Sequence, residues 1–385
     1  MFPNRSASTA LLAAAALVAV ATGCGSGGGA DTAPGGAGST IQFGVSAPLT
    51  GPLAEYGGYY KRGFGLALDE LNAAGGVNGR KIELQWQDSQ SDPKQSVPVA
   101  QKLVSDERVI AELGDFSSTA SMAASPIYQR NKLVQYGFTN SSPLFTTGGD
   151  HMWSPSVSQD VAEVQQTDAV AKYGKKIAVL YLNTSWGQSV YDVFTKEAAK
   201  LGLQVTYSAS YLPSTTDFRP LLINARDSKP DVVYDIGYDN DAAAILNQAP
   251  AVGVTSKIFL EQLTPVGIKL AGANAEGALT TLAWSASSPD PAAQKFTTAF
   301  KAKYGELPGL FDVFAYDALT QLAHAVRKGG ATRQGVYNGL KDSTDLPSVQ
   351  YGAFRFEADR RPQAPPAPPT VVVQGGAQVP VTGQN

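Results

Sequence analysis

Cysteine and histidine are scarce in this chain of 385 residues, and both shortages narrow its chemistry. Cys24 is the only cysteine, so an internal disulfide is impossible and no thiol nucleophile lies in the body of the chain. The two histidines, His151 and His324, stand far apart, and neither has metal-ligand spacing around it. No Gly-x-Ser-x-Gly elbow and no Walker loop occurs in the sequence. These absences favour a binding protein over an enzyme, and we expect no metal and no cofactor.

The chain also lacks a large excess of either basic or acidic residues. The chain has 30 Lys and Arg against 33 Asp and Glu, which gives a formal net charge of −3. A mildly acidic chain offers no electrostatic surface for nucleic acid. Beyond the N-terminal segment, no apolar run is long enough to cross a membrane. We therefore expect no nucleic-acid partner and no membrane span in the body of the protein.

Residues 1–23 have the pattern of a secretory signal peptide. Arg5 precedes an apolar run over residues 10–20 that is too short to span a bilayer as a stable helix. The small residues that lead up to Cys24 resemble the lipobox of bacterial lipoproteins, in which the cysteine thiol carries a diacylglycerol and the chain is cut just before it. An ordinary cleaved signal with an incidental cysteine is the alternative. Either interpretation places the mature protein outside the cytoplasm, and the Gly- and Ser-rich segment 24–40 then serves as a flexible tether.

After the tether, apolar strand-like runs alternate with segments of helical period. This alternation predicts βαβ units, mostly parallel sheets and an α/β fold of two doubly wound, Rossmann-like lobes, because the mature chain is longer than one hydrophobic core normally organises. The first series has strands at 41–47, 82–86, 108–113 and 132–136 and helices at 60–73, 93–106 and 118–131. The second has strands at 176–182, 204–207, 231–236, 257–260 and 277–283 and helices at 161–173, 188–201, 218–228 and 242–252. Three helices at 292–304, 311–328 and 334–341 and a hairpin of 370–374 with 377–381 complete the prediction.

Several motifs of this chain occur together in a known family. They are the opening segment 43–57, Gly75-Gly-Val-Asn-Gly-Arg-Lys-Ile82, Asp92-Pro-Lys94, Phe116-Ser-Ser-Thr119, Trp186-Gly187 and the segment 231–238. With these motifs the chain resembles the leucine/isoleucine/valine-binding proteins, the substrate-binding components of branched-chain amino acid ABC importers. The resemblance implies a type I periplasmic binding protein, a monomer whose lobes are joined by a three-crossover hinge and close over one small molecule like a Venus flytrap. It also implies ABC permease subunits as partners. We assign 41–157 with 285–345 to the first lobe and 158–284 with 346–383 to the second.

The resemblance places the ligand carboxylate on two loops of the first lobe. The first loop provides Ser118, with Ser117 and Thr119 beside it, and the second provides Thr139 and Ser141. A helix beginning at the first loop would offer free N–H groups and a partial positive charge to an anion. The alternative is that Ser117 or Ser118 only caps its own helix, since serine is a preferred N-cap residue.

In the second lobe, the resemblance implies a tyrosine and an acidic residue around the ligand's amino group. Tyr238 occupies the tyrosine position. Glu261 and Gln262 compete for the acidic position, and Gln262 in that place would suit a ligand without an ammonium group. A core tyrosine and a solvated carboxylate are the ordinary alternatives.

Two aromatic residues match the positions that enclose the ligand side chain in this family. Trp186 is expected at a strand–helix turn and Tyr56 in a loop, which are better places for a cleft wall than for a core. Ordinary packing is the alternative for both.

These features predict an extracytoplasmic solute-binding lipoprotein of an ABC importer, anchored to the cell membrane through Cys24. The expected ligand is a small carboxylated molecule, in the first place a branched-chain or other aliphatic amino acid. The same fold could instead bind urea, an amide or an aromatic acid. A ligand sensor that reports to a membrane signalling partner would have the same two lobes.

Overall fold

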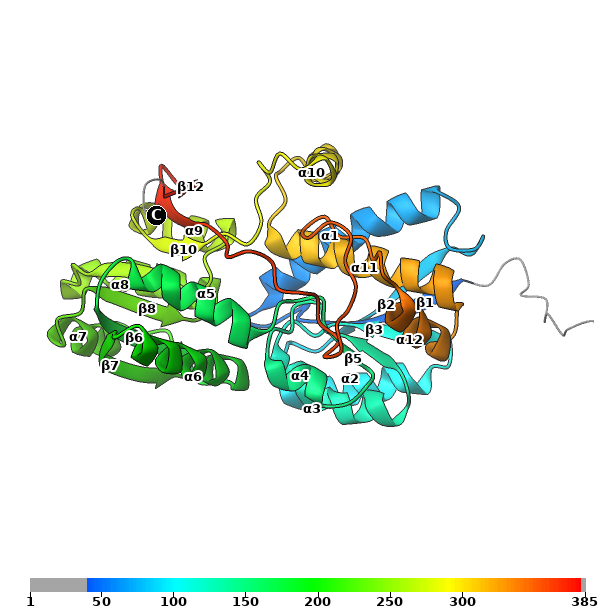
Figure 1. Cartoon of the computed structure of the whole chain (residues 1–385), viewed down its shortest axis with the longest axis horizontal. Helices are drawn as coiled ribbons and strands as arrows, with labels where there is room; N and C mark the ends of the chain where they lie inside the picture. The colour runs from blue at the N-terminus through cyan, green and yellow to red at the C-terminus, as the bar shows by residue number, and fades with distance from the viewer. Residues whose placement is uncertain (1–39, 382–385) are drawn as a thin grey trace, which may run out of the picture. The chain divides into compact units, whose positions relative to one another are not determined.

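Two β-sheets with helices packed around them make up the described residues, 40–381, of this computed structural model (Figure 1). The predicted signal peptide, Cys24 and nearly all of the predicted tether lie outside the described residues. One sheet has five strands in the order β2-β1-β3-β4-β5, all parallel. The other has seven, in the order β12-β11-β10-β9-β8-β6-β7, in which β11 pairs antiparallel with β10 and with β12 and the other pairs are parallel. The predicted α/β class with two doubly wound sheets is confirmed.

The first sheet is buried by helices on both faces. Every residue of β3 and all but one of β1 are buried, as expected for central parallel strands. Helices α1, α11 and α12 pack in series on one another, and α2 packs against α3. The elements are β1 (Ile41–Ala47), α1 (Ala54–Ala73), β2 (Ile82–Asp88), α2 (Pro93–Ser105), β3 (Val109–Leu113), α3 (Ser118–Arg130), β4 (Val134–Tyr136), α4 (Pro143–Thr147), β5 (Met152–Trp153), α10 (Pro291–Tyr304), α11 (Leu310–Gly329) and α12 (Arg333–Asp342).

The second sheet ends in the predicted hairpin. Gly375 and Gly376, at φ of 58° and 77°, form its two-residue turn, in which both positions need the left-handed region that glycine adopts without strain. The elements are α5 (Gln159–Ala171), β6 (Lys176–Leu182), α6 (Ser185–Lys200), β7 (Gln204–Tyr211), α7 (Arg219–Asp227), β8 (Val232–Ile236), α8 (Asp239–Gln248), β9 (Lys257–Leu260), α9 (Pro265–Ala271), β10 (Leu279–Thr281), β11 (Thr370–Gln374) and β12 (Ala377–Pro380).

Most of the predicted elements are present, with differences at the loops that surround the site. Helix α1 begins at Ala54, not at Tyr60, because the helix accommodates Gly57 and Gly58 in its first turns. Gly57 is required there, since a Cβ atom would stand 2.1 Å from the carbonyl oxygen of Pro48. The short elements α4, β5 and α9 were not predicted from the sequence, and they are too short to carry a periodic signal.

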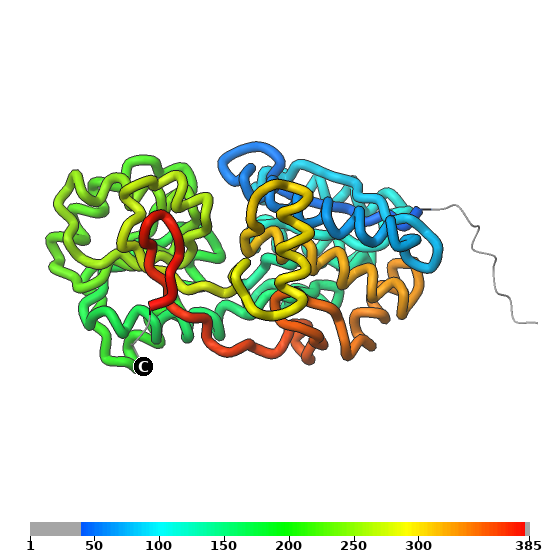
Figure 2. The backbone as a smooth tube through the Cα atoms, turned by 90° about the horizontal axis from the view of Figure 1, so that it is seen from above, coloured from blue at the N-terminus to red at the C-terminus, as the bar shows by residue number. Residues whose placement is uncertain are grey.

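The chain crosses between the sheets three times, after β5, after β10 and before β11. Two of these connections are seen in yellow-green and red in Figure 2. Residues 346–361 still contact the first lobe: Ser348 bonds Asp317 of α11, and Arg361 bonds the carbonyl oxygen of Asn140. We therefore propose that the third crossing lies after residue 361, later than the predicted boundary at 345. The other lobe boundaries stay predictions.

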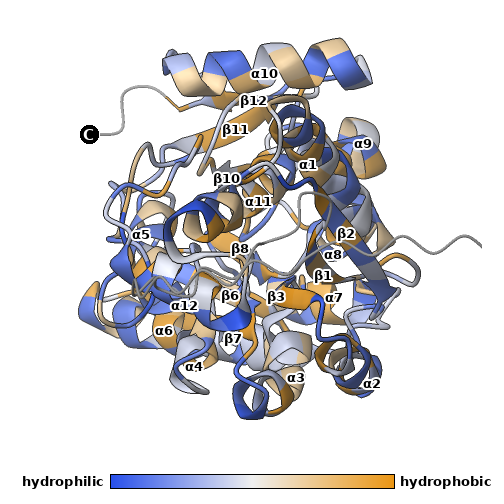
Figure 3. Cartoon of the chain, turned by 90° about the vertical axis from the view of Figure 1, so that its right-hand side faces the viewer, coloured by the Kyte–Doolittle hydropathy of each residue, from blue (hydrophilic) through white to orange (hydrophobic). Residues whose placement is uncertain are grey.

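Apolar residues concentrate on the strands and on the inward sides of the helices, whereas the outer helices carry polar colour (Figure 3). Large buried aromatic side chains, among them Phe43, Phe64 and Tyr136, fill the first core, and Tyr234 and Phe259 fill the second. Within residues 40–381, no helix is both long and apolar enough to pass through a membrane.

Candidate functional site

A cavity of about 880 Å³ opens between the two lobes. Its walls come from the loops that follow the carboxyl ends of β3, β4, β6, β8 and β9, where ligands bind in doubly wound sheets. Seven of the ten residues predicted for ligand binding line it: Ser118, Thr139, Ser141, Trp186, Tyr238, Glu261 and Gln262. The structure thus brings together side chains that lie far apart in the sequence.

The first-lobe wall is the N-terminus of α3 with the loop after β4. Ser118 is the first residue of α3, and its side chain is only 2% exposed at the cavity wall. Ser117 is the N-cap, but its hydroxyl makes no capping bond to any residue of the described chain. The first N–H groups of α3 therefore lack a side-chain cap and carry the positive end of the helix dipole beside the cavity.

Thr139 is held rigidly in the second loop of this wall. Its hydroxyl is 2.8 Å from the Tyr60 hydroxyl and donates to the carbonyl oxygen of Phe116 at 3.1 Å. The Thr139 hydroxyl is thus engaged by the protein. Ser141 follows on the same loop and lines the cavity.

Three predicted residues do not lie on the cavity wall formed by the described residues: Tyr56, Ser117 and Thr119. Tyr56 is fully buried in the first turn of α1, where its ring stacks on Phe116 with centroids 3.8 Å apart. The sequence placed Tyr56 in a loop on the cavity wall. This was wrong because α1 begins before the first residue of its apolar repeat, so that Tyr56 belongs to the helix. Phe116, which the site prediction did not include, takes the place on the wall.

Trp186 and Tyr238 form the aromatic part of the second-lobe wall. Trp186 lies in the first turn of α6 and is 7% exposed. Its ring stacks on that of Tyr238, with centroids 4.8 Å apart and an interplanar angle of 16°. Tyr238 is the N-cap residue of α8, and Phe116 is 5.3 Å from its ring across the lobes. These rings form a flat apolar surface beside the polar groups.

Both Glu261 and Gln262 reach the cavity, but their side chains are used differently. The Gln262 amide donates to the Tyr56 hydroxyl at 2.5 Å and to Asp239 at 3.3 Å. The Glu261 carboxylate accepts from the amides of Gln159 at 3.2 Å and Gln166 at 3.0 Å. Gln262 is therefore committed to contacts between the lobes, and the carboxylate of Glu261 is the group held at the cavity.

A second carboxyl group, Glu163 of α5, stands behind Glu261 and was missed by the sequence analysis. Glu163 is completely buried, and the Tyr234 hydroxyl lies 3.1 Å from each of its carboxyl oxygens and 2.5 Å from Glu261. Burial is the main cause that raises the pKa of both carboxyl groups; the charge of Glu261 raises the pKa of Glu163 further. The available signal was the series Gln159, Glu163 and Gln166, whose spacing puts three polar residues on one face of helix α5, the face that is buried.

Asp239 joins the lobes at one end of the cavity. Its buried carboxylate accepts from the Tyr56 hydroxyl at 3.1 Å and from the hydroxyl of Thr264 at 2.7 Å. Tyr59 of α1 also reaches Thr264, at 3.3 Å. Helix α1 is therefore linked by hydrogen bonds to the loop before α9, which brings the two lobes together over this end of the cavity.

Comparison with known proteins gives the family of the chain. The family model described as "Periplasmic binding protein" matches residues 40–376. The chain belongs to the periplasmic binding protein family. This is a family of extracytoplasmic solute-binding proteins, and no enzyme class is attached to it.

Several individual proteins are similar to this periplasmic binding protein over most of its length. A leucine-, isoleucine-, valine-, threonine- and alanine-binding protein of Pseudomonas aeruginosa is 29% identical over 80% of this chain and 84% of its own. The crystal structure of a leucine-binding protein from Thermotoga maritima has a TM-score of 0.81 at 23% identity and covers 89% of this chain and 98% of its own. A solute-binding protein from R. palustris in complex with benzoate has a TM-score of 0.82 at 20% identity, covering 89% and 96%.

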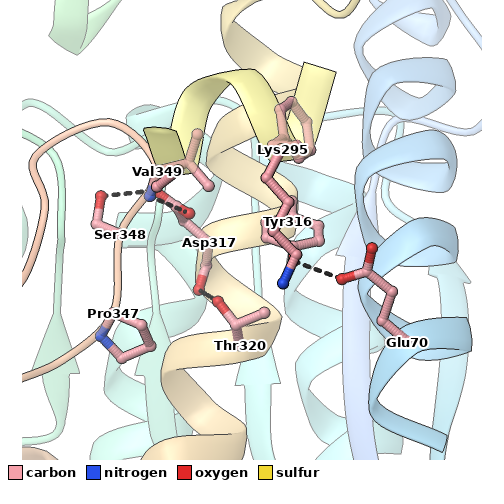
Figure 4. A pocket seen from close by; sticks show the side chains of 10 residues that line it. Glu70, Lys295, Tyr316, Asp317, Thr320, Pro347, Ser348 and Val349 are labelled. Carbon is pink, nitrogen blue, oxygen red and sulfur yellow. Dashed lines mark hydrogen bonds between the residues drawn. The ribbon is translucent and has the colours of Figure 1, made fainter. Parts of the chain in front are cut away.

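A smaller pocket of about 200 Å³ lies between α10, α11 and the segment 347–349, and several of its polar groups bond one another (Figure 4). Asp317 accepts from the Ser348 hydroxyl at 2.6 Å and from the Val349 N–H at 2.8 Å. Tyr316 donates to Glu70 at 2.6 Å. These bonds fasten the segment after α12 to α11, so the pocket has a structural explanation and the large cavity remains the candidate site of this periplasmic binding protein.

Proposed function

We propose that this periplasmic binding protein captures a small zwitterionic ligand, a branched-chain or other aliphatic amino acid, and delivers it to the permease of an ABC importer. The observation that carries the proposal is the opposite polarity of the two cavity walls. The first-lobe wall offers helix N–H groups with Ser118 and Ser141, and the second-lobe wall offers the carboxylate of Glu261. A ligand with a carboxylate at one end and an ammonium at the other matches both walls at once.

The first-lobe wall suits an anion. Ser118 stands at the start of a 13-residue helix, so the dipole and the free N–H groups of α3 face the cavity together. No lysine or arginine side chain is among the described residues that line the cavity, so the field comes from the backbone. Charge-assisted bonds of this kind are about twice as strong as neutral ones.

The second-lobe wall suits a cation and opposes a second anion. Glu163 and Glu261 share the Tyr234 hydroxyl, and among residues 40–381 neither forms an ion pair with a basic side chain. An ammonium group beside Glu261 would compensate the charge that this pair otherwise carries. The stacked rings of Trp186 and Tyr238 provide the apolar contact for an aliphatic side chain. The amino acid specificity in the name of the Pseudomonas aeruginosa relative supports this assignment.

An aromatic acid is the second candidate, favoured by the aromatic wall and by the benzoate-bound neighbour from R. palustris. A ligand without an ammonium group, bound by Gln262 in place of Glu261, has less support, because the Gln262 amide is bonded to Tyr56 and Asp239. A sensor role would use the same site, and a neighbouring receptor gene in place of permease and ATPase genes would indicate it.

The test is calorimetric titration with leucine and with analogues that lack one charge. We expect leucine to bind, and 4-methylpentanoate (no ammonium) and leucinamide (no carboxylate) each to bind about 10- to 100-fold more weakly, since a lost charged bond costs about 1.5–3 kcal/mol. Benzoate, urea and valine complete the panel. Tighter binding of benzoate or urea than of every amino acid tested would contradict the proposal.

Membrane attachment through Cys24 is a separate part of the proposal. It rests on the apolar run, the small residues before Cys24 and the Gly- and Ser-rich segment after it. We expect the wild-type protein, expressed in a bacterial host, to enter the detergent phase on Triton X-114 partitioning and the Cys24→Ser variant to stay in the aqueous phase. A secreted Cys24→Ser protein that still enters the detergent phase would rule out the lipid anchor.

A further inference from the structure

Arg361, in the segment before the third crossing, is a buried cation directly behind the first-lobe wall. It is 2% exposed and is not among the residues that line the cavity. Its guanidinium donates to the carbonyl oxygens of Asn140 at 3.0 Å, Ser156 at 2.9 Å and Ser142 at 2.5 Å, and to the Ser154 hydroxyl at 3.2 Å. Two of these four acceptors, Asn140 and Ser142, flank Ser141, and the other two lie after β5.

The charge of Arg361 has no bonded counter-ion. Among residues 40–381, no carboxylate forms an ion pair with its guanidinium. Asp359 and Asp160 are the nearby acids, and both are exposed to solvent; Asp359 accepts only from the backbone N–H of Arg361. Burial lowers the pKa of Arg361 to about 10, so the group is still charged at neutral pH. Burying a charge without a partner is costly, and carbonyl oxygens compensate it only in part.

The bonds of Arg361 fix the direction of the peptide group between Asn140 and Ser141. This peptide is trans, so its C=O and N–H groups point in opposite directions. The Asn140 carbonyl points at the guanidinium, and the Ser141 N–H therefore points away from it. Ser141 is on the cavity wall, with Asn140 buried behind it. The peptide between them forms a short polarised link from the buried cation toward the cavity.

We propose that Arg361 is a positioning residue for the ligand carboxylate. The negative charge of the bound carboxylate balances the buried positive charge of Arg361 through the Asn140–Ser141 peptide. The guanidinium holds the carbonyl groups on both sides of Ser141 and increases the positive field at the Ser141 N–H. The positive field on this wall then has two sources, the start of α3 and Arg361, which is far away in the sequence. This inference rests on the proposed function, since it requires a ligand with a carboxylate.

The test compares leucine with leucinamide, which keeps the ammonium and lacks the carboxylate charge. The variant is Arg361→Gln, which keeps hydrogen-bond donors but has no charge. Arg360→Gln is the matched control, because Arg360 also bonds backbone carbonyl oxygens, those of Met152 and Thr146, but does not bond the residues around Ser141. We expect the leucine-to-leucinamide affinity ratio to fall about tenfold or more in Arg361→Gln, the lower range for a charge-assisted bond, and to stay unchanged in Arg360→Gln.

The outcomes separate this inference from the proposed function. Equal weakening of both ligands in Arg361→Gln, with the ratio kept, would mean that Arg361 only supports the fold, and would overturn the inference. No preference for leucine in the wild-type protein would instead overturn the carboxylate assignment itself. If Arg361→Gln does not fold, Arg361→Met, which fills the same buried space without a charge, is titrated with the same two ligands. A leucine-to-leucinamide ratio that falls supports the inference, and a ratio equal to that of the wild-type protein overturns it.

Discussion

The Glu261→Gln variant is expected to lose about 10- to 100-fold of its affinity for leucine, while its affinity for 4-methylpentanoate stays the same or increases. The loss corresponds to the roughly 1.5–3 kcal/mol carried by a hydrogen bond to a charged group. Glutamine is nearly the same size, so the cavity keeps its shape. Isothermal titration of the two ligands against the wild-type protein and the variant measures both effects.

The reason for this effect is the position of Glu261 at the cavity wall with its other bonds already made. The amides of Gln159 and Gln166 and the hydroxyl of Tyr234 hold the carboxylate from the protein side. These bonds fix the side chain and leave its charge for the ammonium group of a ligand. Replacing the carboxylate by a neutral amide removes the attraction for that ammonium and, for an anionic ligand, a repulsion as well.

A matched control is available in the same cavity. Glu306 also lines it but is well exposed, so the Glu306→Gln variant changes the net charge equally without touching the proposed ammonium site. We expect leucine affinity to be unchanged there, since exposed charges are screened. Equal losses in the two variants, or a Glu261→Gln protein that binds leucine as tightly as the wild-type protein, would show that Glu261 does not hold the ammonium group.

The sequence was sufficient to predict every strand except the two-residue β5, because the signals of the longer strands are local. Strands β1 and β6 are continuous apolar runs bounded by turns, and both occur with the predicted limits. The C-terminal hairpin is equally local, since two adjacent glycines select its turn. The start of helix α1 was predicted too late: Gly57 and Gly58 resemble loop residues, and only the close approach of the Pro48 carbonyl explains why Gly57 is needed in a helix.

The site residues were predicted from sequence motifs. Such motifs could not identify buried residues that lie behind the cavity wall and contact the residues that line it. Glu163 and Arg361 are buried and belong to segments without a recognised motif. Their significance depends on which groups surround them, namely Glu261 with Tyr234 in one case and the loop around Ser141 in the other. Tyr56 shows the opposite failure, because a matching motif position lies one layer behind the wall, under Phe116.

The pairing of Glu163 with Glu261 also predicts that the affinity for leucine depends on pH. Burial raises the pKa of both carboxyl groups above the ordinary value, and the charge of Glu261 raises the pKa of Glu163 further. The groups around the pair are Tyr234, Thr167, Gln159 and Gln166, with the Asp235 carboxyl as a further neighbour. Within residues 40–381, no Lys, Arg or His side chain forms an ion pair with Glu163 or Glu261 that would stabilise their charged forms. The empty site therefore keeps a proton at a higher pH than an isolated glutamate, whose pKa is about 4.3.

The direction of the pH dependence of leucine affinity follows from the proton that the Glu163–Glu261 pair keeps in the empty site. Because the pKa values are raised in the folded protein, the pair stabilises the empty protein at pH below the ordinary glutamate pKa, and this contribution is lost as the pH rises through the raised values. An ammonium ligand favours the ionised form, so binding releases the proton. Leucine affinity should then increase with pH, by up to about tenfold per pH unit below the raised pKa, and become constant above it.

Titration of leucine between pH 5 and pH 8, in buffers of different ionisation enthalpy, measures both the affinity and the number of protons released. Proton release on leucine binding is expected to be larger at the low end of this range than at the high end. The ligand 4-methylpentanoate provides the internal control, since it has no ammonium group and should not gain affinity as the pH rises. The Glu163→Gln variant removes the carboxyl group whose pKa is raised further, so its leucine curve should shift to lower pH. A wild-type affinity that is constant over the range, or a Glu163→Gln curve that coincides with a pH-dependent wild-type curve, would show that the two carboxyl groups do not act as a pair.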